Sequence, residues 1–206
     1  MVEGGGLELI KNQWYAVLDG AELLPGRALT VVRLGEKMVF WRDSSGSPCC
    51  ILDRCCHRGA SLGAGEVHGN HVECPFHGFQ YDKTGQVKII PANGKNAPVP
   101  ERYRVRSYTV REEHGLIWLW WGEATEQLPE IEFFPDLREG WTYATRVDRW
   151  AVHYSRAIEN QLDVVHLPFV HKTTIGRGNK HLVNGPVVKR EGNLLKFYVD
   201  NDLRSE

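Results

Sequence analysis

Short apolar runs separated by glycine, proline and aspartate make up the chain from Trp14 to about Gly122. β-Branched and aromatic residues are frequent in these runs, and such residues favour strands over helices. No repeat or low-complexity tract interrupts the pattern. The first part of the chain is therefore predicted to be all-β, and we place this domain at residues 1–122.

The clearest strand signals within this region are a hairpin and an aromatic run. The runs 28–34 and 37–42 flank Gly35 and Glu36, a spacing typical of a tight hairpin in which glycine takes the left-handed conformation. The run 116–121 contains three tryptophans, whose rings pack well on a pleated surface. A strand is therefore predicted there as well.

The composition changes at 123–140, where acidic residues and prolines are frequent, as is typical of a connection between domains. Residues 123–206 are therefore assigned to a second domain. Within it, 141–150 alternates like a strand, and 151–165 contains neither proline nor glycine, which favours a helix. Pro168 is expected to stop or kink that helix.

A hairpin is also predicted near the end of the chain. The runs 187–189 and 194–199 flank Glu191, Gly192 and Asn193, which are typical turn residues. The second domain is thus predicted to mix α and β structure.

Charge and composition narrow the functional classes. The 206 residues include 25 Lys and Arg and 26 Asp and Glu, so no broad basic field is present to attract nucleic acid or an anionic membrane. No apolar run approaches the roughly 18 residues of a membrane span, and residues 1–6 lack a signal-peptide pattern. We expect a cytoplasmic protein with neither nucleic acid nor membrane as its partner.

Five cysteines are too few for a disulfide scaffold in a chain of this length, so metal chemistry is the better interpretation. Cys55 and His57 form one pair, and Cys74 and His77 form a second, with sixteen residues between them. Two thiolates and two imidazoles can hold zinc, or a 2Fe-2S cluster in which histidines replace cysteines on one iron. Zinc fingers usually place cysteines at one end and histidines at the other, so the alternating order favours the cluster.

These pairs resemble the C-x-H and C-x2-H motifs of the Rieske iron–sulfur domain, and Gly78 and Tyr81 after the second pair match it too. The resemblance implies a mainly β fold, a Rieske-type antiparallel β-sandwich that binds a 2Fe-2S cluster. The implied cluster ligands are Cys55, His57, Cys74 and His77. Cys56 departs from the family, which usually has proline there, and is interpreted as a bystander thiol.

A second set of candidate ligands follows in the predicted helix. Glu159, Asp163 and His166 would share one helix face, and a break at Pro168 could swing His171 back toward it. Two imidazoles beside carboxylates are how a 2-His-1-carboxylate site holds non-heme Fe(II) while leaving positions open for oxygen. Taken alone, such residues are more often satisfied by ordinary hydrogen bonds.

A Rieske motif followed by Asp163, His166 and His171 in a D-x2-H-x4-H pattern resembles the oxygenase component, or alpha subunit, of Rieske non-heme iron oxygenases. The resemblance implies that both histidines bind the catalytic iron and that Asp163 bridges to a Rieske histidine of the neighbouring subunit in a homotrimer. Glu159 occupies a position near the iron where relatives often carry Asn, Asp or Glu. Residues 123–206 would then begin an α+β catalytic domain of the helix-grip type.

The third iron ligand of this family, an Asp or Glu, lies far downstream in longer chains. Asp200, Asp202 and Glu206 are the carboxylates within reach in sequence, and nothing in their spacing singles them out. We therefore interpret the chain as an oxygenase subunit truncated at its C-terminus, with the third ligand unassigned.

The resemblance implies an oxidoreductase that takes electrons from a reductase or ferredoxin and uses O2 to hydroxylate or demethylate a small organic, usually aromatic, substrate. The alternative is a Rieske ferredoxin-like electron carrier, which would need only the residues up to about Gly122. The pattern at 163–171 argues against a carrier, since a carrier has no use for a second metal site. A zinc-stabilised interaction domain is a third hypothesis, which the ligand order disfavours.

Arg102, Arg104 and Arg106 alternate along a predicted strand, which would place three positive charges on one face. Such a stripe is usually solvated, and the alternative is a docking surface for a partner protein. Both interpretations stay open at the level of sequence.

Overall fold

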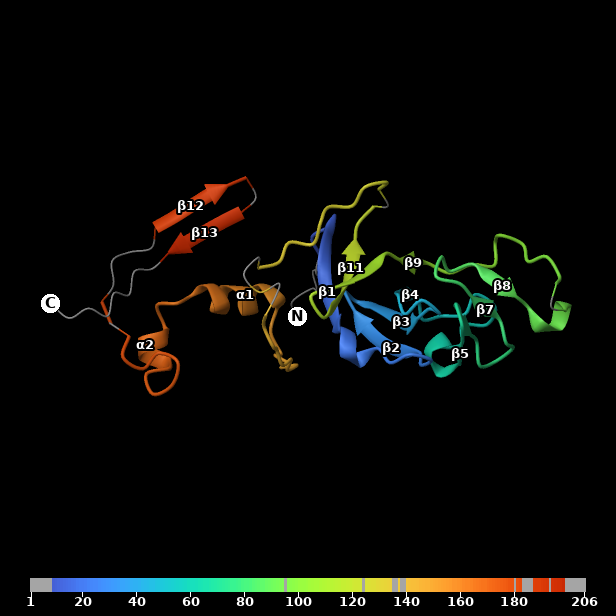
Figure 1. Cartoon of the computed structure of the whole chain (residues 1–206), viewed down its shortest axis with the longest axis horizontal. Helices are drawn as coiled ribbons and strands as arrows, with labels where there is room; N and C mark the ends of the chain where they lie inside the picture. Colours follow the sequence, from blue (N-terminus) through green and yellow to red (C-terminus); the bar gives the residue numbers. More distant parts are fainter. Residues whose placement is uncertain are drawn as a thin grey trace, which may run out of the picture. The chain divides into compact units, whose positions relative to one another are not determined.

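The computed structural model describes residues 9–94, 96–123, 125–134, 137, 140–179, 181–182, 187–192 and 194–198. By its contacts the chain divides into two compact units, Met1–Thr145 and Arg146–Glu206. Figure 1 shows the elements of each unit, coloured along the sequence. Among the described residues, the first unit is built from strands and short 3-10 helices, and the α-helices lie in the second unit.

The first unit consists of antiparallel strands, which form three sheets in the described part of the chain. Their strand orders are β2-β3-β4-β9, β1-β11-β10 and β5-β6-β7-β8. The strands are β1 (Gln13–Asp19), β2 (Leu29–Arg33), β3 (Glu36–Arg42), β4 (Pro48–Leu52), β5 (Val67–His68), β6 (His71–Glu73), β7 (Gln80–Tyr81), β8 (Val87–Ile89), β9 (Ser107–Tyr108), β10 (Val110–Glu113) and β11 (Leu116–Trp121). The 3-10 helices are η1 (Gly20–Glu22), η2 (Leu62–Ala64) and η3 (Pro91–Asn93). The mainly β fold class is confirmed.

The predicted hairpin is present as the antiparallel pair β2 and β3. Leu34 and Gly35 form its turn with φ angles of +52° and +80°, the positive pair that a type I′ turn requires. Glycine takes this conformation readily, whereas a leucine there is uncommon. The strand predicted at 116–121 is confirmed as β11.

Strand β3 separates two hydrophobic cores, because alternate side chains of a strand point to opposite faces. Val39 and Trp41 lie in one core, which also contains Tyr81 of β7. Met38 and Phe40 lie in the other core, together with side chains of β1 and β11. One strand therefore joins the part of the unit around β5 to β8 to the part around β1 and β11.

The neighbouring strand β4 contributes two buried cysteines to these cores. Cys49 lies in the first core and Cys50 in the second, with exposed fractions of 2% and 1%. Burial raises the pKa of the Cys49 thiol to about 11 and also raises the pKa of Cys50. Both thiols are therefore neutral near pH 7 and pack as small apolar side chains.

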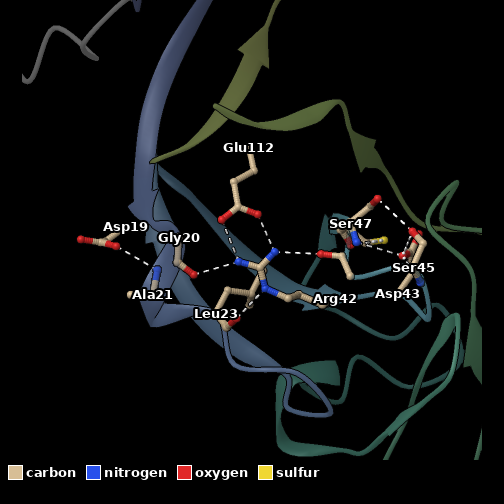
Figure 2. A network of polar contacts seen from close by, with 11 residues as sticks. Asp19, Gly20, Ala21, Leu23, Arg42, Asp43, Ser45, Ser47 and Glu112 are labelled. Carbon is tan, nitrogen blue, oxygen red and sulfur yellow. Dashed lines mark hydrogen bonds and ion pairs between the residues drawn. The ribbon is translucent and has the colours of Figure 1, made fainter. Parts of the chain in front are cut away.

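Arg42, at the end of β3, is the centre of a polar network that ties together several segments of the first unit (Figure 2). Its guanidinium donates two hydrogen bonds to the Glu112 carboxylate, with N···O distances of 2.5 and 2.9 Å. Further N–H groups donate to the carbonyl oxygens of Gly20, Leu23 and Gly46. One side chain thus satisfies three backbone acceptors outside the sheets.

We expect Glu112→Gln to lower stability in a pH-dependent way. The hydrogen bond from Arg42 holds the pKa of Glu112 below its ordinary value, so the native state favours the ionised carboxylate. The stabilisation is therefore fully present at pH values above the pKa that Glu112 has in the unfolded chain. It is lost as the pH falls through the lower pKa that Glu112 has in the native state. At pH 7 the free energy of unfolding of the variant should be lower by roughly 1–2 kcal/mol, a modest loss because the Arg42–Glu112 pair is partly exposed.

Urea unfolding of both proteins between pH 7 and pH 3 measures this difference. The difference in the free energy of unfolding between wild type and Glu112→Gln should become smaller as the pH falls. Glu126→Gln, at an exposed position, serves as the control. A gap of constant size across this range would contradict the prediction.

The second unit contains α1 (Tyr154–Leu162), α2 (Leu167–Val170), β12 (Val187–Glu191) and β13 (Leu194–Tyr198). The strands pair as an antiparallel hairpin, as predicted. Helix α1 begins after His153, whose side chain accepts a hydrogen bond from the Ser155 N–H at 3.3 Å. No helix in the described part of the chain is both long and apolar enough to cross a membrane.

Two expectations for this region were wrong. Residues 141–150 form no strand and are exposed throughout: alternation suits a strand, but a strand also needs a hydrogen-bonding neighbour. The helix predicted over 151–165 ends at Leu162. Pro168 does not terminate it but lies in the first turn of α2, where the missing N–H costs nothing.

Candidate functional site

The two predicted Cys-His pairs lie on two loops of the same construction. One loop follows β4 and the other connects β6 to β7. In the first, the Gly59 N–H donates to the Cys55 carbonyl at 2.9 Å, and in the second the Gly78 N–H donates to the Cys74 carbonyl at 3.0 Å. Both glycines have positive φ angles, of +74° and +72°, a conformation that favours glycine. A glycine thus closes each of the two loops.

The loops bring like side chains together. The Cys55 and Cys74 side chains are buried, with exposed fractions of 3% and 2%, and their thiols lie close enough to interact. His57 and His77 are exposed, and their ring centroids lie 4.7 Å apart. Burial raises the pKa of the Cys74 thiol. A paired set of sulfurs inside and imidazoles outside is the donor set that a Rieske cluster takes, with two cysteines on one iron and two histidines on the other.

Each imidazole packs against the ring of a phenylalanine. Phe79 stacks on His57 with centroids 5.0 Å apart and an interplanar angle of 5°. Phe76 lies against His77 with centroids 4.0 Å apart. Phe79 is buried and Phe76 is 58% exposed. The imidazole pair therefore lies at the surface of the unit, on a base that restricts the orientation of the rings.

Tyr81 joins the first loop from strand β7. Its hydroxyl lies 3.1 Å from the Cys55 sulfur and 3.2 Å from the Cys56 sulfur, and it accepts a hydrogen bond from the Cys56 N–H at 3.0 Å. Burial raises the pKa of Tyr81 well above its ordinary value, so the hydroxyl keeps its proton as a donor. The exposed Cys56 thiol accepts a hydrogen bond from the Tyr81 hydroxyl. The sequence motif included Tyr81 but gave no sign of these contacts.

A buried carboxylate connects the end of the first loop to strand β2. Asp53 is 4% exposed and accepts hydrogen bonds from Thr30 at 2.9 Å, Ser61 at 2.5 Å and the Gly63 N–H at 2.8 Å. Lys37 adds an ion pair at 3.1 Å. Burial alone would raise the pKa of Asp53, and these hydrogen bonds more than offset it, so the pKa lies below its ordinary value. Sequence reasoning missed Asp53, because no local motif marks a carboxylate whose partners lie on three separate segments.

The second candidate set is arranged differently from the prediction. Since α1 ends at Leu162, Glu159, Asp163 and His166 do not share the face of one continuous helix. The Glu159 carboxylate instead pairs with Arg156 at 2.6 Å. Asp163 and His166 nevertheless meet beyond the helix end, with 3.5 Å between Oδ2 and Nδ1.

His166 and His171 come together across α2, with ring centroids 5.3 Å apart. The His166 Nδ1 atom is buried and makes no hydrogen bond in the described part of the chain, and it faces Asp163 Oδ2 at 3.5 Å. No group of three or more His, Cys, Asp or Glu side chains gathers into a metal site among the described residues. Asp200, Asp202 and Glu206, the carboxylates considered as a third ligand, lie outside those residues.

Two family models match the chain. The model of the Rieske [2Fe-2S] domain matches residues 13–109. The model of the vanillate O-demethylase oxygenase C-terminal domain matches residues 150–202. The first match includes both Cys-His loops, and the second includes Asp163, His166 and His171.

Two of the curated relatives are named as a subunit of a monooxygenase system and as a demethylase. The chain is 29% identical over 204 residues to the putative toluene-4-sulfonate monooxygenase system iron-sulfur subunit TsaM2 of Comamonas testosteroni, covering 95% of this chain and 57% of the relative. It is 31% identical over 192 residues to the methylxanthine N1-demethylase NdmA of Pseudomonas putida, covering 82% and 49%. The chain thus spans about half the length of these relatives.

Solved structures agree with these matches. The structure of Pseudomonas putida CBB5 NdmA superposes with a TM-score of 0.75 at 28% identity, over 92% of this chain and 59% of that one. A structure of dicamba monooxygenase with non-heme iron and dicamba matches with a TM-score of 0.50 at 34% identity, over 55% and 34%. The similarity to NdmA therefore extends across both units of the chain.

Proposed function

Because this chain belongs to the Rieske non-heme iron oxygenases, we propose that it forms part of an oxygenase component that uses O2 to hydroxylate or demethylate an aromatic substrate, with electrons from a reductase or ferredoxin. The observation that carries the proposal is the presence in one chain of two paired sets of donors. The two cluster loops of the first unit carry a pair of buried thiols and a pair of exposed imidazoles, and His166 and His171 meet in the second unit.

We assign Cys55 and Cys74 to one iron of a 2Fe-2S cluster and His57 and His77 to the other. When bound, such a cluster takes up and passes on single electrons. The protein holds the imidazoles against aromatic rings at the surface, where an electron donor can approach. The Tyr81 hydroxyl lies within hydrogen-bond distance of the Cys55 sulfur, and hydrogen bonds to cluster sulfurs tune the cluster potential.

We assign His166 and His171 to a mononuclear non-heme iron, which activates O2 when bound. Asp163 lies next to His166 and is proposed to orient that imidazole. In a homotrimer it would also bridge to a cluster histidine of a neighbouring subunit. The Glu159 carboxylate is occupied by Arg156, and we assign it no role toward the iron.

The names of the relatives support an aromatic substrate. Toluene-4-sulfonate and methylxanthine, in the names of TsaM2 and NdmA, both contain aromatic rings, and one name describes a monooxygenase system while the other describes a demethylase. Either hydroxylation or demethylation of a ring substituent is consistent with this pair.

The test is the content of iron and acid-labile sulfide in anaerobically purified, iron-supplied protein. We expect about three irons and two sulfides per chain, and about two of each in the double variant His166→Ala, His171→Ala. The double variant His68→Ala, His71→Ala, which alters two histidines between the cluster loops, should keep all three irons. About two irons and two sulfides in every protein would favour the electron carrier, and a colourless zinc protein would exclude both functions.

A further inference from the structure

A hollow of about 540 Å³ lies directly beside the first cluster loop. Its lining includes Cys55 and His57, two of the proposed cluster ligands, together with four arginines and no carboxylate. The arginines are Arg54, Arg58, Arg104 and Arg106. All four are exposed. The lining next to the proposed cluster thus carries four positive side chains and no negative one, although the whole chain has a formal net charge of −1.

The charge comes from two segments that are far apart in sequence. The Leu52 N–H donates to the Arg106 carbonyl at 2.8 Å, which holds the end of β4 against the stretch before β9. Arg104 forms an isolated antiparallel bridge with Gln86. The predicted arginine stripe is therefore not a regular strand, because β9 contains only Ser107 and Tyr108. Backbone pairing, not strand alternation, gathers these charges.

Three of the arginines carry uncompensated charge. Arg106 pairs with Glu36 at 2.6 Å and lies over the Tyr108 and Trp121 rings. Arg54, Arg58 and Arg104 form no ion pair with any described residue. Like charges around one hollow repel one another, and the repulsion is relieved when an anionic surface approaches.

We propose that this arginine hollow is the docking surface for the electron donor, and that the donor is an acidic protein whose carboxylates contact Arg54, Arg58 and Arg104. The inference rests on the proposed function, since it concerns the partner of the same site. In the encounter the donor loses one electron, which the cluster domain takes up, and no bond forms or breaks. The hollow borders the loop that carries His57, so a protein bound there lies against the exposed imidazole pair.

Such a surface makes docking depend on salt. Attraction between exposed charges is screened at high ionic strength, so a complementary partner should bind much more tightly at low salt. If the arginines were only solvated surface residues, reversing their charge would affect partner binding no more than reversing a charge elsewhere on the surface. Charge reversal at the hollow therefore separates the two interpretations.

The experiment measures binding of the iron-loaded chain to an acidic plant-type [2Fe-2S] ferredoxin by surface plasmon resonance, in low and in high salt. The variants are Arg104→Glu alone, which leaves the cluster loop unchanged, and Arg58→Glu, Arg104→Glu together. The matched control is Arg27→Glu, Lys83→Glu, which makes the same charge change at exposed positions outside the hollow. Reduced methyl viologen, a cationic one-electron donor, tests separately whether the cluster in each variant accepts electrons.

At low salt we expect the double variant to weaken ferredoxin binding by about tenfold or more and to lose most of its salt dependence, while the control stays within about twofold of wild type. Cluster colour and reduction by methyl viologen should be the same in all proteins. Equal ferredoxin affinity in all proteins, or equal losses in both double variants, would overturn the inference while leaving the proposed function intact. Tight binding of inorganic phosphate at the hollow without ferredoxin binding would also overturn it. A chain that binds no iron or sulfide would instead contradict the proposed function.

Discussion

Replacing Cys55 by serine should reduce the acid-labile sulfide of the chain from about two per chain to nearly none, whereas replacing the adjacent Cys56 by serine should leave it unchanged. The two cysteines are neighbours in sequence, and both sulfurs lie near the Tyr81 hydroxyl. Of the two, the Cys55 thiol is buried and lies close to the thiol of Cys74, whereas Cys56 is exposed. Serine offers iron a much poorer ligand than a thiolate, so the cluster would be left with three ligands.

Sulfide and iron assays, together with the visible spectrum, decide this prediction. Because Cys56 is exposed, its replacement should not disturb the fold, and Cys56→Ser is therefore a matched control one residue away. Cys74→Ser should behave like Cys55→Ser. Loss of sulfide in Cys56→Ser with retention in Cys55→Ser would contradict the ligand assignment and make Cys56 the ligand.

Replacing Asp53 by alanine should lower the free energy of unfolding by about 3–5 kcal/mol, the cost typical of removing one partner from a buried ionic network. The change leaves the Ser61 hydroxyl, the Gly63 N–H and the Thr30 hydroxyl without their common acceptor. It also removes the carboxylate that forms an ion pair with Lys37. The end of the first cluster loop would lose its attachment to β2, since Ser61 and Gly63 follow that loop directly.

Urea unfolding followed by tryptophan fluorescence measures the effect. Thr30→Ala removes one donor and leaves Asp53 with its other partners, so it should cost only about 1 kcal/mol. A loss in Asp53→Ala no larger than that in Thr30→Ala would show that the carboxylate contributes little and that its burial is not compensated by these contacts.

Local patterns predicted the regular elements where turn chemistry and strand period coincide. The hairpin of β2 and β3 has its glycine at the positive φ that the turn requires, and β12 and β13 flank the predicted turn at Gly192. The same reasoning failed at 141–150, where alternation occurs without a neighbouring strand. It also placed Asp163 within a helix that ends one residue earlier, because helix ends depend on capping and packing as well as on propensity.

The motif spacing was sufficient to identify the family, its cofactors and the mainly β fold, because each Cys-His pair lies within one short loop and its ligand order is a local property of the chain. The ligand assignments themselves stay predictions. Only the tertiary structure brought thiol to thiol and imidazole to imidazole, placed Tyr81 and Asp53 at the first loop, and gathered Arg54 with Arg104 around one hollow. These contacts join segments that are distant in sequence, and they depend on which strands pair and in what register, which no local pattern specifies.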